Sequence, residues 1–166
     1  MDVARLIEDA VLLAFIAIVI VTDWRWQRIP NVVTYPTMIV GLALGAVDGL
    51  PGSPLGGGFL DHLVATVAPF VLLYPVYAPG WMKAGDVKLL MAVGALRGGS
   101  FLFFSFFYGA MLGGVLALVL LAARRVSPPE QPVSGRVATA MKSSIPYGVA
   151  LGAGALVALF VELRAT

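Results

Sequence analysis

Long apolar stretches alternate with short polar, proline-rich or glycine-rich breaks along the whole chain. A helix needs about 20 mostly apolar residues to cross a bilayer, with roughly 17 to 25 usual. The pattern therefore predicts six transmembrane helices, of which the fourth is too short to cross as a straight helix without borrowing flanking residues. The expected helices cover about residues 6–22, 32–47, 60–78, 87–98, 101–123 and 144–163.

The composition agrees with a chain that resides in lipid. Of its 166 residues 60% are hydrophobic and only 12% are charged, and the mean hydropathy is +0.94. A soluble domain carries roughly a quarter charged residues. We expect an all-α, polytopic membrane protein in which residues 1–166 form a single membrane-embedded domain. Membrane lipid is an expected partner, and nucleic acid is not.

The first apolar stretch is expected to be a retained helix and not a signal peptide. Asp2, Glu8 and Asp9 stand where a signal peptide carries a basic n-region. The chain has no cysteine, which excludes disulfides and thiolate metal sites, and its lone histidine is His62. We expect no metal and no organic cofactor, so any catalysis must come from other side chains.

The basic residues predict the orientation of the helices. With six helices and the N-terminus outside, eight of the eleven Lys and Arg residues lie on the cytoplasmic side, as the positive-inside rule requires. Residues 124–142 then form a basic cytoplasmic loop. The cytoplasmic set is Arg25, Arg28, Lys83, Lys88, Arg124, Arg125, Arg136 and Lys142, and the outer set is Arg5, Arg97 and Arg164.

Glycines spaced four residues apart recur in the expected helices, where they share one face and allow two backbones to approach closely. We interpret them as packing devices. The pairs are Gly41 with Gly45, Gly94 with Gly98, Gly109 with Gly113, and Gly148 with Gly152.

Two aspartates stand out because both lie at the cytoplasmic ends of apolar segments. Asp23 follows the first segment and Asp86 precedes the fourth. An ionised aspartate inside a membrane costs about 2.5 to 3.5 kcal/mol on insertion scales, so such residues usually serve a function or face water. Each also has a structural interpretation: Asp23 as a solvated helix end beside Arg25 and Arg28, and Asp86 as a helix N-cap. Their occurrence as a pair weakens both interpretations.

These residues carry a resemblance to a known family. Asp23 followed by Ile29-Pro30-Asn31 resembles the first aspartate motif of the type IV prepilin peptidases. The segment Ala84-Gly85-Asp86-Val87-Lys88-Leu89-Leu90 resembles their GxGD motif, which is shared with other intramembrane aspartyl proteases, although Lys83 replaces its first glycine. Ile145-Pro146-Tyr147-Gly148 is similar to a stretch of the family's last helix. The resemblance thus extends over nearly the whole chain.

The resemblance implies an aspartic endopeptidase that removes the short basic leader of a prepilin. Asp23 and Asp86 would be the catalytic pair, one ionised and one protonated, because two neighbouring carboxylates do not both ionise cheaply. The chain lacks cysteine and begins at a helix, so we expect the short form of tight-adherence (Flp-type) pilus systems, without methyltransferase activity. The expected location is the bacterial or archaeal cytoplasmic (inner) membrane, with the site near the cytoplasmic face. The candidate supporting residues are Arg28, Pro30, Asn31, Lys83, Gly85, Lys88, Pro146 and Gly148.

Two other classes of function remain open at this stage. In a small ion- or proton-coupled transporter, Asp23 and Asp86 would bind ions or relay protons. Such a transporter tends to contain internal repeats with matching broken helices, and the two halves of this chain show no convincing self-similarity. A noncatalytic pilus-assembly scaffold could retain the same fold.

Overall fold

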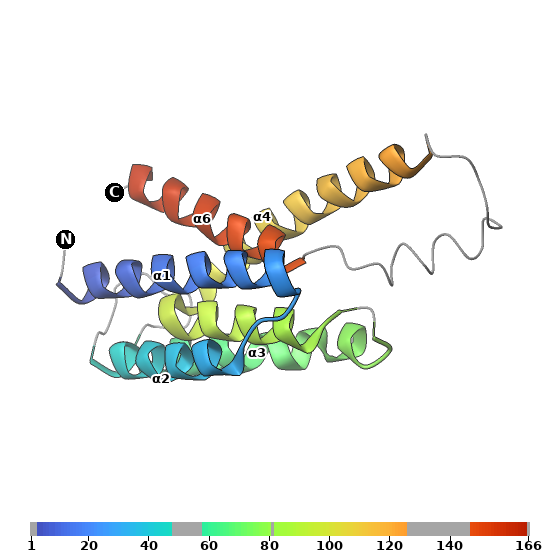
Figure 1. Cartoon of the computed structure of the whole chain (residues 1–166). Coiled ribbons are helices and arrows are strands. Elements are labelled where there is room, and N and C mark those ends of the chain that lie inside the picture. Colours follow the sequence, from blue (N-terminus) through green and yellow to red (C-terminus); the bar gives the residue numbers. More distant parts are fainter. Residues whose placement is uncertain (1–2, 48–57, 81, 126–146, 166) are drawn as a thin grey trace.

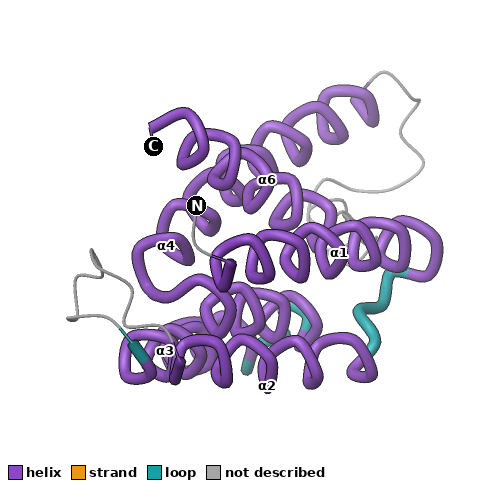
Figure 2. The backbone as a smooth tube through the Cα atoms, turned by 90° about the vertical axis from the view of Figure 1, so that its left-hand side faces the viewer, coloured by secondary structure: helices purple, strands orange, loops and turns teal. Residues whose placement is uncertain are grey.

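The computed structural model describes residues 3–47, 58–80, 82–125 and 147–165, and all regular structure within these ranges is helical. In the described part of the chain, five helices follow one another and pack as a bundle (Figures 1 and 2). The predicted loop 124–142 falls outside the described residues from residue 126 onward, as does Pro146. The helices are α1 (Val3–Trp26), α2 (Asn31–Val47), α3 (Phe59–Tyr77), α4 (Ala84–Arg125) and α6 (Tyr147–Ala165).

Helix α4 is two helical segments joined at Gly98, whose φ of 74° and ψ of −173° are not helical. Glycine adopts this conformation readily because it has no Cβ, and a Cβ here would also lie 2.0 Å from Oδ2 of Asp61. The Asp61 carboxylate accepts a hydrogen bond from the backbone N–H of Gly99, at 3.3 and 3.1 Å from its two oxygens. Asp61 of α3 therefore caps the segment that follows the break.

The break separates the fourth and fifth helices expected from the sequence. The first segment begins at Ala84, three residues before the predicted start at residue 87, and so includes Asp86. Residues 84–97 extend roughly 21 Å at about 1.5 Å per residue, which is less than the roughly 30 Å of a hydrocarbon core. The fourth helical segment is therefore short.

Consecutive helical segments alternate in direction, so that their ends gather at two opposite ends of the bundle (Figure 1). Helix α1 begins and α6 ends at one end, and α2, α4 and α6 begin at the other. Among the residues that the structure describes, three stretches are long and apolar enough to cross a membrane, namely Phe59–Tyr77, Ala84–Val119 and Tyr147–Arg164. This is a membrane protein. Six crossings and an outer N-terminus stay predictions.

The first segment of α4 forms the centre of the core. Its Leu89, Leu90 and Leu96 are at most 1% exposed, and they share a cluster of buried apolar side chains with α1 and α6. Helices approach this segment closely through glycine: a Cβ at Gly94 would lie 2.1 Å from the backbone oxygen of Ala65 in α3. The packing role predicted for this glycine thus has a direct structural basis.

Gly94→Ala is expected to destabilise the fold by about 1–3 kcal/mol, because the added methyl group collides with backbone atoms that cannot rotate away. The same substitution at Gly114, also in α4, meets nothing within 4 Å, and alanine favours a helix over glycine by about 1 kcal/mol. Thermal unfolding in one detergent should show a lower midpoint for Gly94→Ala and an equal or higher one for Gly114→Ala. Equal midpoints for the two variants would contradict the close packing.

A cluster of charged side chains joins three helices at the end where α1 begins. Arg97 Nη1 lies 2.8 Å from Asp9 Oδ1 and 3.6 Å from Glu8 Oε2, and Nη2 lies 2.5 Å from Glu162 Oε2. Glu162 of α6 also pairs with Arg5 of α1. The side chain of Arg97 is 4% exposed and that of Glu8 is fully buried. We call Arg5, Glu8, Asp9, Arg97 and Glu162 the far-end cluster.

Candidate active site

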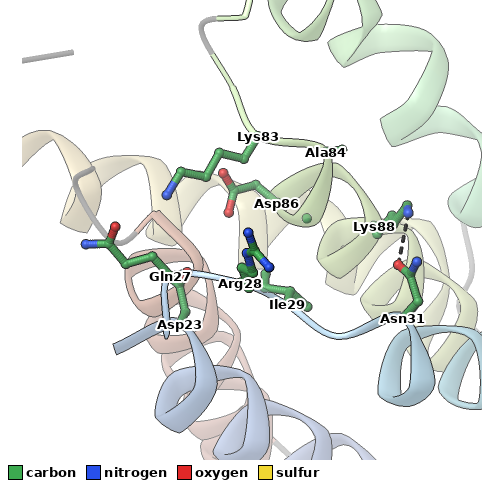
Figure 3. Close-up of a pocket in the computed structure, with 10 residues that line it drawn as sticks. Asp23, Gln27, Arg28, Ile29, Asn31, Lys83, Ala84, Asp86 and Lys88 are labelled. Carbon is green, nitrogen blue, oxygen red and sulfur yellow. Dashed lines mark hydrogen bonds between the residues drawn. The ribbon is translucent and has the colours of Figure 1, made fainter. Parts of the chain in front are cut away.

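The end of the bundle opposite the far-end cluster holds both aspartates of interest. Asp23 lies near the end of α1 and Asp86 in the first turn of α4, and each is only 2% exposed. Both line a cavity of about 290 Å³ between these two helices and the connection that leads to α2 (Figure 3). The lining residues are Asp23, Gln27, Arg28, Ile29, Asn31, Lys83, Ala84, Gly85, Asp86 and Lys88.

The connection between α1 and α2 is shaped by backbone hydrogen bonds at its two ends. Gln27 has a φ of 50°, and its N–H donates to the backbone oxygen of Asp23 at 2.9 Å. A left-handed residue that makes this bond is a common way for a helix to end. At the other end, the oxygen of Pro30 accepts from the Thr34 hydroxyl at 2.9 Å and from the N–H groups of Val33 and Thr34. These bonds end α1 and begin α2 within a few residues.

Asp86 is held by the start of α4. Its backbone N–H donates to the oxygen of Lys83 at 3.1 Å, and the N–H of Lys83 donates to its carboxylate. Asp86 is the third residue of the helix and not its N-cap, so the N-cap interpretation is wrong: the bond to the Lys83 N–H is instead the return half of a capping box. Among the described residues, Oδ2 of Asp86 has no hydrogen-bond partner, although it is buried.

Asp23 contacts the start of α6. Its Oδ2 accepts a hydrogen bond from the backbone N–H of Val149 at 3.2 Å. A Cβ at Gly148 would lie 2.7 Å from the same oxygen and 3.1 Å from Cδ1 of Ile29. The two aspartates also lie close enough to interact electrostatically. Segments far apart in the sequence thus bring two carboxylates to one cavity.

Lys83 and Lys88 lie on different sides of Asp86. The side chain of Lys83 extends with that of Asp86 toward the end of α1 (Figure 3). Lys88 turns the other way, where Nζ donates to Oδ1 of Asn31 at 2.9 Å and lies 5.3 Å from the centre of the Tyr35 ring. Lys88 therefore links α4 to α2 at the rim of the cavity.

Two buried carboxyl groups that line one cavity can serve as acid and base. The sequence of residues 10–118 matches the type IV leader peptidase family. The match extends over more than half of the chain and includes every residue that lines the cavity. The chain belongs to the type IV leader peptidase family. No curated protein and no solved structure matches it.

Membership of this family implies a peptidase-like function for the chain. Of the supporting residues expected from the sequence, five line the cavity with the two aspartates, and Gly148 contacts Asp23. Pro30 is not among the lining residues but accepts the bonds that begin α2. Pro146 lies outside the described residues. The five are Arg28, Asn31, Lys83, Gly85 and Lys88.

The cavity also contains residues that were not predicted from the sequence. Gln27, Ile29 and Ala84 line the cavity, and Val149 supplies a backbone donor to Asp23. The side chain of Ile29 lies between Gly85 and Gly148. A Cβ at Gly85 would lie 3.3 Å from the Cβ of Ile29, and a Cβ at Gly148 would lie 3.1 Å from its Cδ1. In the sequence, only the position of Ile29 within the first aspartate motif could have indicated that it lines the site. Across the described ranges, no three acidic or histidine side chains gather as metal ligands would.

Proposed function

We propose that this leader peptidase is an intramembrane aspartyl endopeptidase that removes the short basic leader of type IV, Flp-like prepilins. The observation that carries the proposal is the pairing of Asp23 and Asp86 in one cavity, each almost completely buried. A buried charge is expensive without a partner, so a solvated helix end does not explain Asp23. Two neighbouring carboxyl groups that share one site are what aspartic peptidases use for catalysis.

The reaction follows from that pair. One carboxylate takes a proton from water while the other, which is protonated, donates to the oxygen of the scissile carbonyl group. The cavity lies at one end of an apolar bundle, which supports a scissile bond at the junction of a polar leader and an apolar helix. Neither step draws on a metal ion.

The proposed location is the cytoplasmic face of a bacterial or archaeal inner membrane. Trp24 and Trp26, at the end of α1, are 72% and 64% exposed. Tryptophan is enriched where a membrane meets water, and Arg25 and Arg28 beside them are exposed as well. These residues support a site just below the interface, on the side that the positive-inside rule assigns to the cytoplasm.

Cleavage of a co-expressed Flp-type prepilin tests the proposal. Wild-type protein should remove the leader, seen as a loss of mass without an added methyl group, and the Asp23→Asn/Asp86→Asn double variant should not. Membrane levels of the two proteins are compared to exclude a loss of folding. Cleavage by the double variant would rule out the aspartyl mechanism. Aspartate-dependent ion uptake without cleavage would indicate a transporter, and pilus assembly without either activity a scaffold.

A further inference from the structure

The first turn of α6 provides Asp23 with a backbone hydrogen-bond donor. Helix α6 begins at Tyr147, so the N–H of Val149 belongs to the turn whose N–H groups have no partner within the helix. This N–H donates to Asp23 Oδ2 at 3.2 Å. The start of a helix also carries a positive partial charge, which favours a nearby anion.

The donor reaches Asp23 because residue 148 has no side chain. A Cβ at Gly148 would lie 2.7 Å from Oδ2 and 2.9 Å from Cγ of Asp23, closer than van der Waals contact allows. Any larger residue would push the carboxylate away from Val149 or move α6. The glycine therefore sets where the carboxylate of Asp23 sits.

The two aspartates differ in how their oxygens are satisfied. Asp86 accepts from the backbone N–H of Lys83, but its Oδ2 is buried and, among the described residues, meets no donor. A protonated carboxyl group needs a donor on only one oxygen, because the other carries the hydrogen and can donate it, here to the oxygen of a bound substrate. Two neighbouring carboxylates favour sharing one proton over bearing two charges.

We propose that Gly148 positions Asp23 against the first turn of α6 as the ionised general base, and that Asp86 holds the shared proton on Oδ2 as the general acid. This inference rests on the proposed peptidase function for its chemistry, but the place of the proton does not depend on cleavage. Gly148 acts as a positioning residue because it works through Asp23.

The assignment gives a balanced reaction. Asp23 removes one proton from water as the water oxygen bonds to the scissile carbonyl carbon, and Asp86 gives its proton to the carbonyl oxygen. The tetrahedral diol then collapses: the carbon–nitrogen bond breaks, Asp23 passes its proton to the leaving amine, and Asp86 regains a proton from a hydroxyl group. Water is consumed, two peptide fragments form, and both aspartates return to their starting states.

Among the described residues, the cationic side chains that line the cavity are Arg28, from the connection after α1, and Lys83 and Lys88, from the α4 side. Of these, Lys88 turns away from the pair to bond Asn31. Helix α6 adds no charged side chain to the cavity lining. Substitutions in the first turn of α6 therefore change the donor to Asp23 and leave these cations in place.

Gly148→Ala tests the positioning role, with Gly152→Ala as the matched control. The three atoms nearest to a Cβ at Gly152 belong to the side chains of Ile16 and Ile20, the closest at 3.1 Å. We expect Gly148→Ala to lower kcat by roughly 10- to 100-fold, as small displacements of catalytic groups do, and to leave KM within about twofold. Gly152→Ala should retain nearly full kcat. Because alanine favours a helix over glycine, a loss at residue 148 is not explained by a weaker helix.

A second pair of variants removes the donor itself. Val149→Pro deletes the N–H and is compatible with the first turn of a helix, where no carbonyl one turn earlier is displaced, whereas Val149→Ala keeps the N–H. Val149→Pro should reproduce the loss of kcat, and Val149→Ala should not. Full activity of both Gly148→Ala and Val149→Pro, at normal membrane levels, would overturn the positioning role.

The pH profile decides which aspartate carries the proton. If Asp23 is the ionised base, loss of its donor moves the acidic limb of the kcat profile to higher pH and leaves the alkaline limb in place. If Asp23 instead held the proton in the active form, the alkaline limb would move, and the assignment would be overturned. The acidic limb should move by a similar amount in Gly148→Ala and Val149→Pro, and not in Gly152→Ala.

An infrared titration of the carboxyl groups separates this inference from the proposed function. The infrared signal of Asp23 and Asp86 is identified as the part of the wild-type carboxyl signal that is absent in the Asp23→Asn/Asp86→Asn variant. Its first ionisation should move to higher pH in Gly148→Ala, with the second unchanged. A protein that cleaves no prepilin but shows this shift would refute the peptidase function and uphold the proton assignment, and a shift of the second step alone would overturn the assignment.

Discussion

Asp23→Asn alone, or Asp86→Asn alone, is expected to lower the rate of leader cleavage by roughly 10⁴-fold, near the upper range for general acid–base catalysis. Asparagine has almost the same shape as aspartate but neither accepts nor donates the catalytic proton. Because the two carboxylates act as one unit, the double variant should be no slower than either single variant. Steady-state cleavage of a leader peptide by the purified proteins provides the three rates.

A third buried aspartate serves as the control for that experiment. Asp61 is 4% exposed and lies next to Gly98 and Gly99, at the other end of the bundle. The amide oxygen of Asp61→Asn still accepts from Gly99, so this variant should fold and keep most of its cleavage rate. Losses in the two site variants that simply multiplied in the double variant would show that Asp23 and Asp86 act independently, against the proposed pair.

Arg97→Met is expected to destabilise the protein by about 3–5 kcal/mol, the usual effect of removing one partner from a buried ion pair. Methionine approximates the length of the arginine stem but carries no charge. Three acidic side chains of the far-end cluster would lose this cation, among them the fully buried Glu8. The change should appear as a markedly lower midpoint of thermal unfolding and a lower level in the membrane.

Arg164→Met provides the comparison at the same end of the bundle. Arg164 is exposed and lies 4.7 Å from the centre of the Phe160 ring. Its loss should change stability by less than about 1 kcal/mol, in the range of exposed cation–π contacts. Similar unfolding midpoints for Arg97→Met and Arg164→Met would mean that the far-end cluster contributes little to stability.

Much of the fold was predictable from the sequence because lipid imposes strict demands on it. Helices must satisfy their own backbone groups in a membrane, so apolar length and its interruptions predict where they lie. The break at Gly98 falls between the fourth and fifth expected segments. The start of the fourth was misplaced by three residues, because Gly85 and Asp86 interrupt the apolar stretch although they belong to the first turn of the helix.

The aspartate pair was predictable, but its surroundings were not. Each aspartate lies in a local motif of its own, and the distribution of basic residues predicts that both lie on the cytoplasmic side. Both features can be read directly from the sequence. The donor from Val149 is a backbone group of a helix more than a hundred residues after Asp23, and no side chain marks it. Gln27 likewise adopts its left-handed conformation because α1 must end there, although glycine or asparagine is the usual choice.

The pairing of Arg5 with Glu162 has a practical consequence for engineering. It holds the start of α1 beside the end of α6, at the end of the bundle remote from Asp23 and Asp86. Affinity tags or fluorescent proteins fused beyond either helix would therefore emerge next to each other. Neither would obstruct a substrate that approaches the cavity from the opposite face.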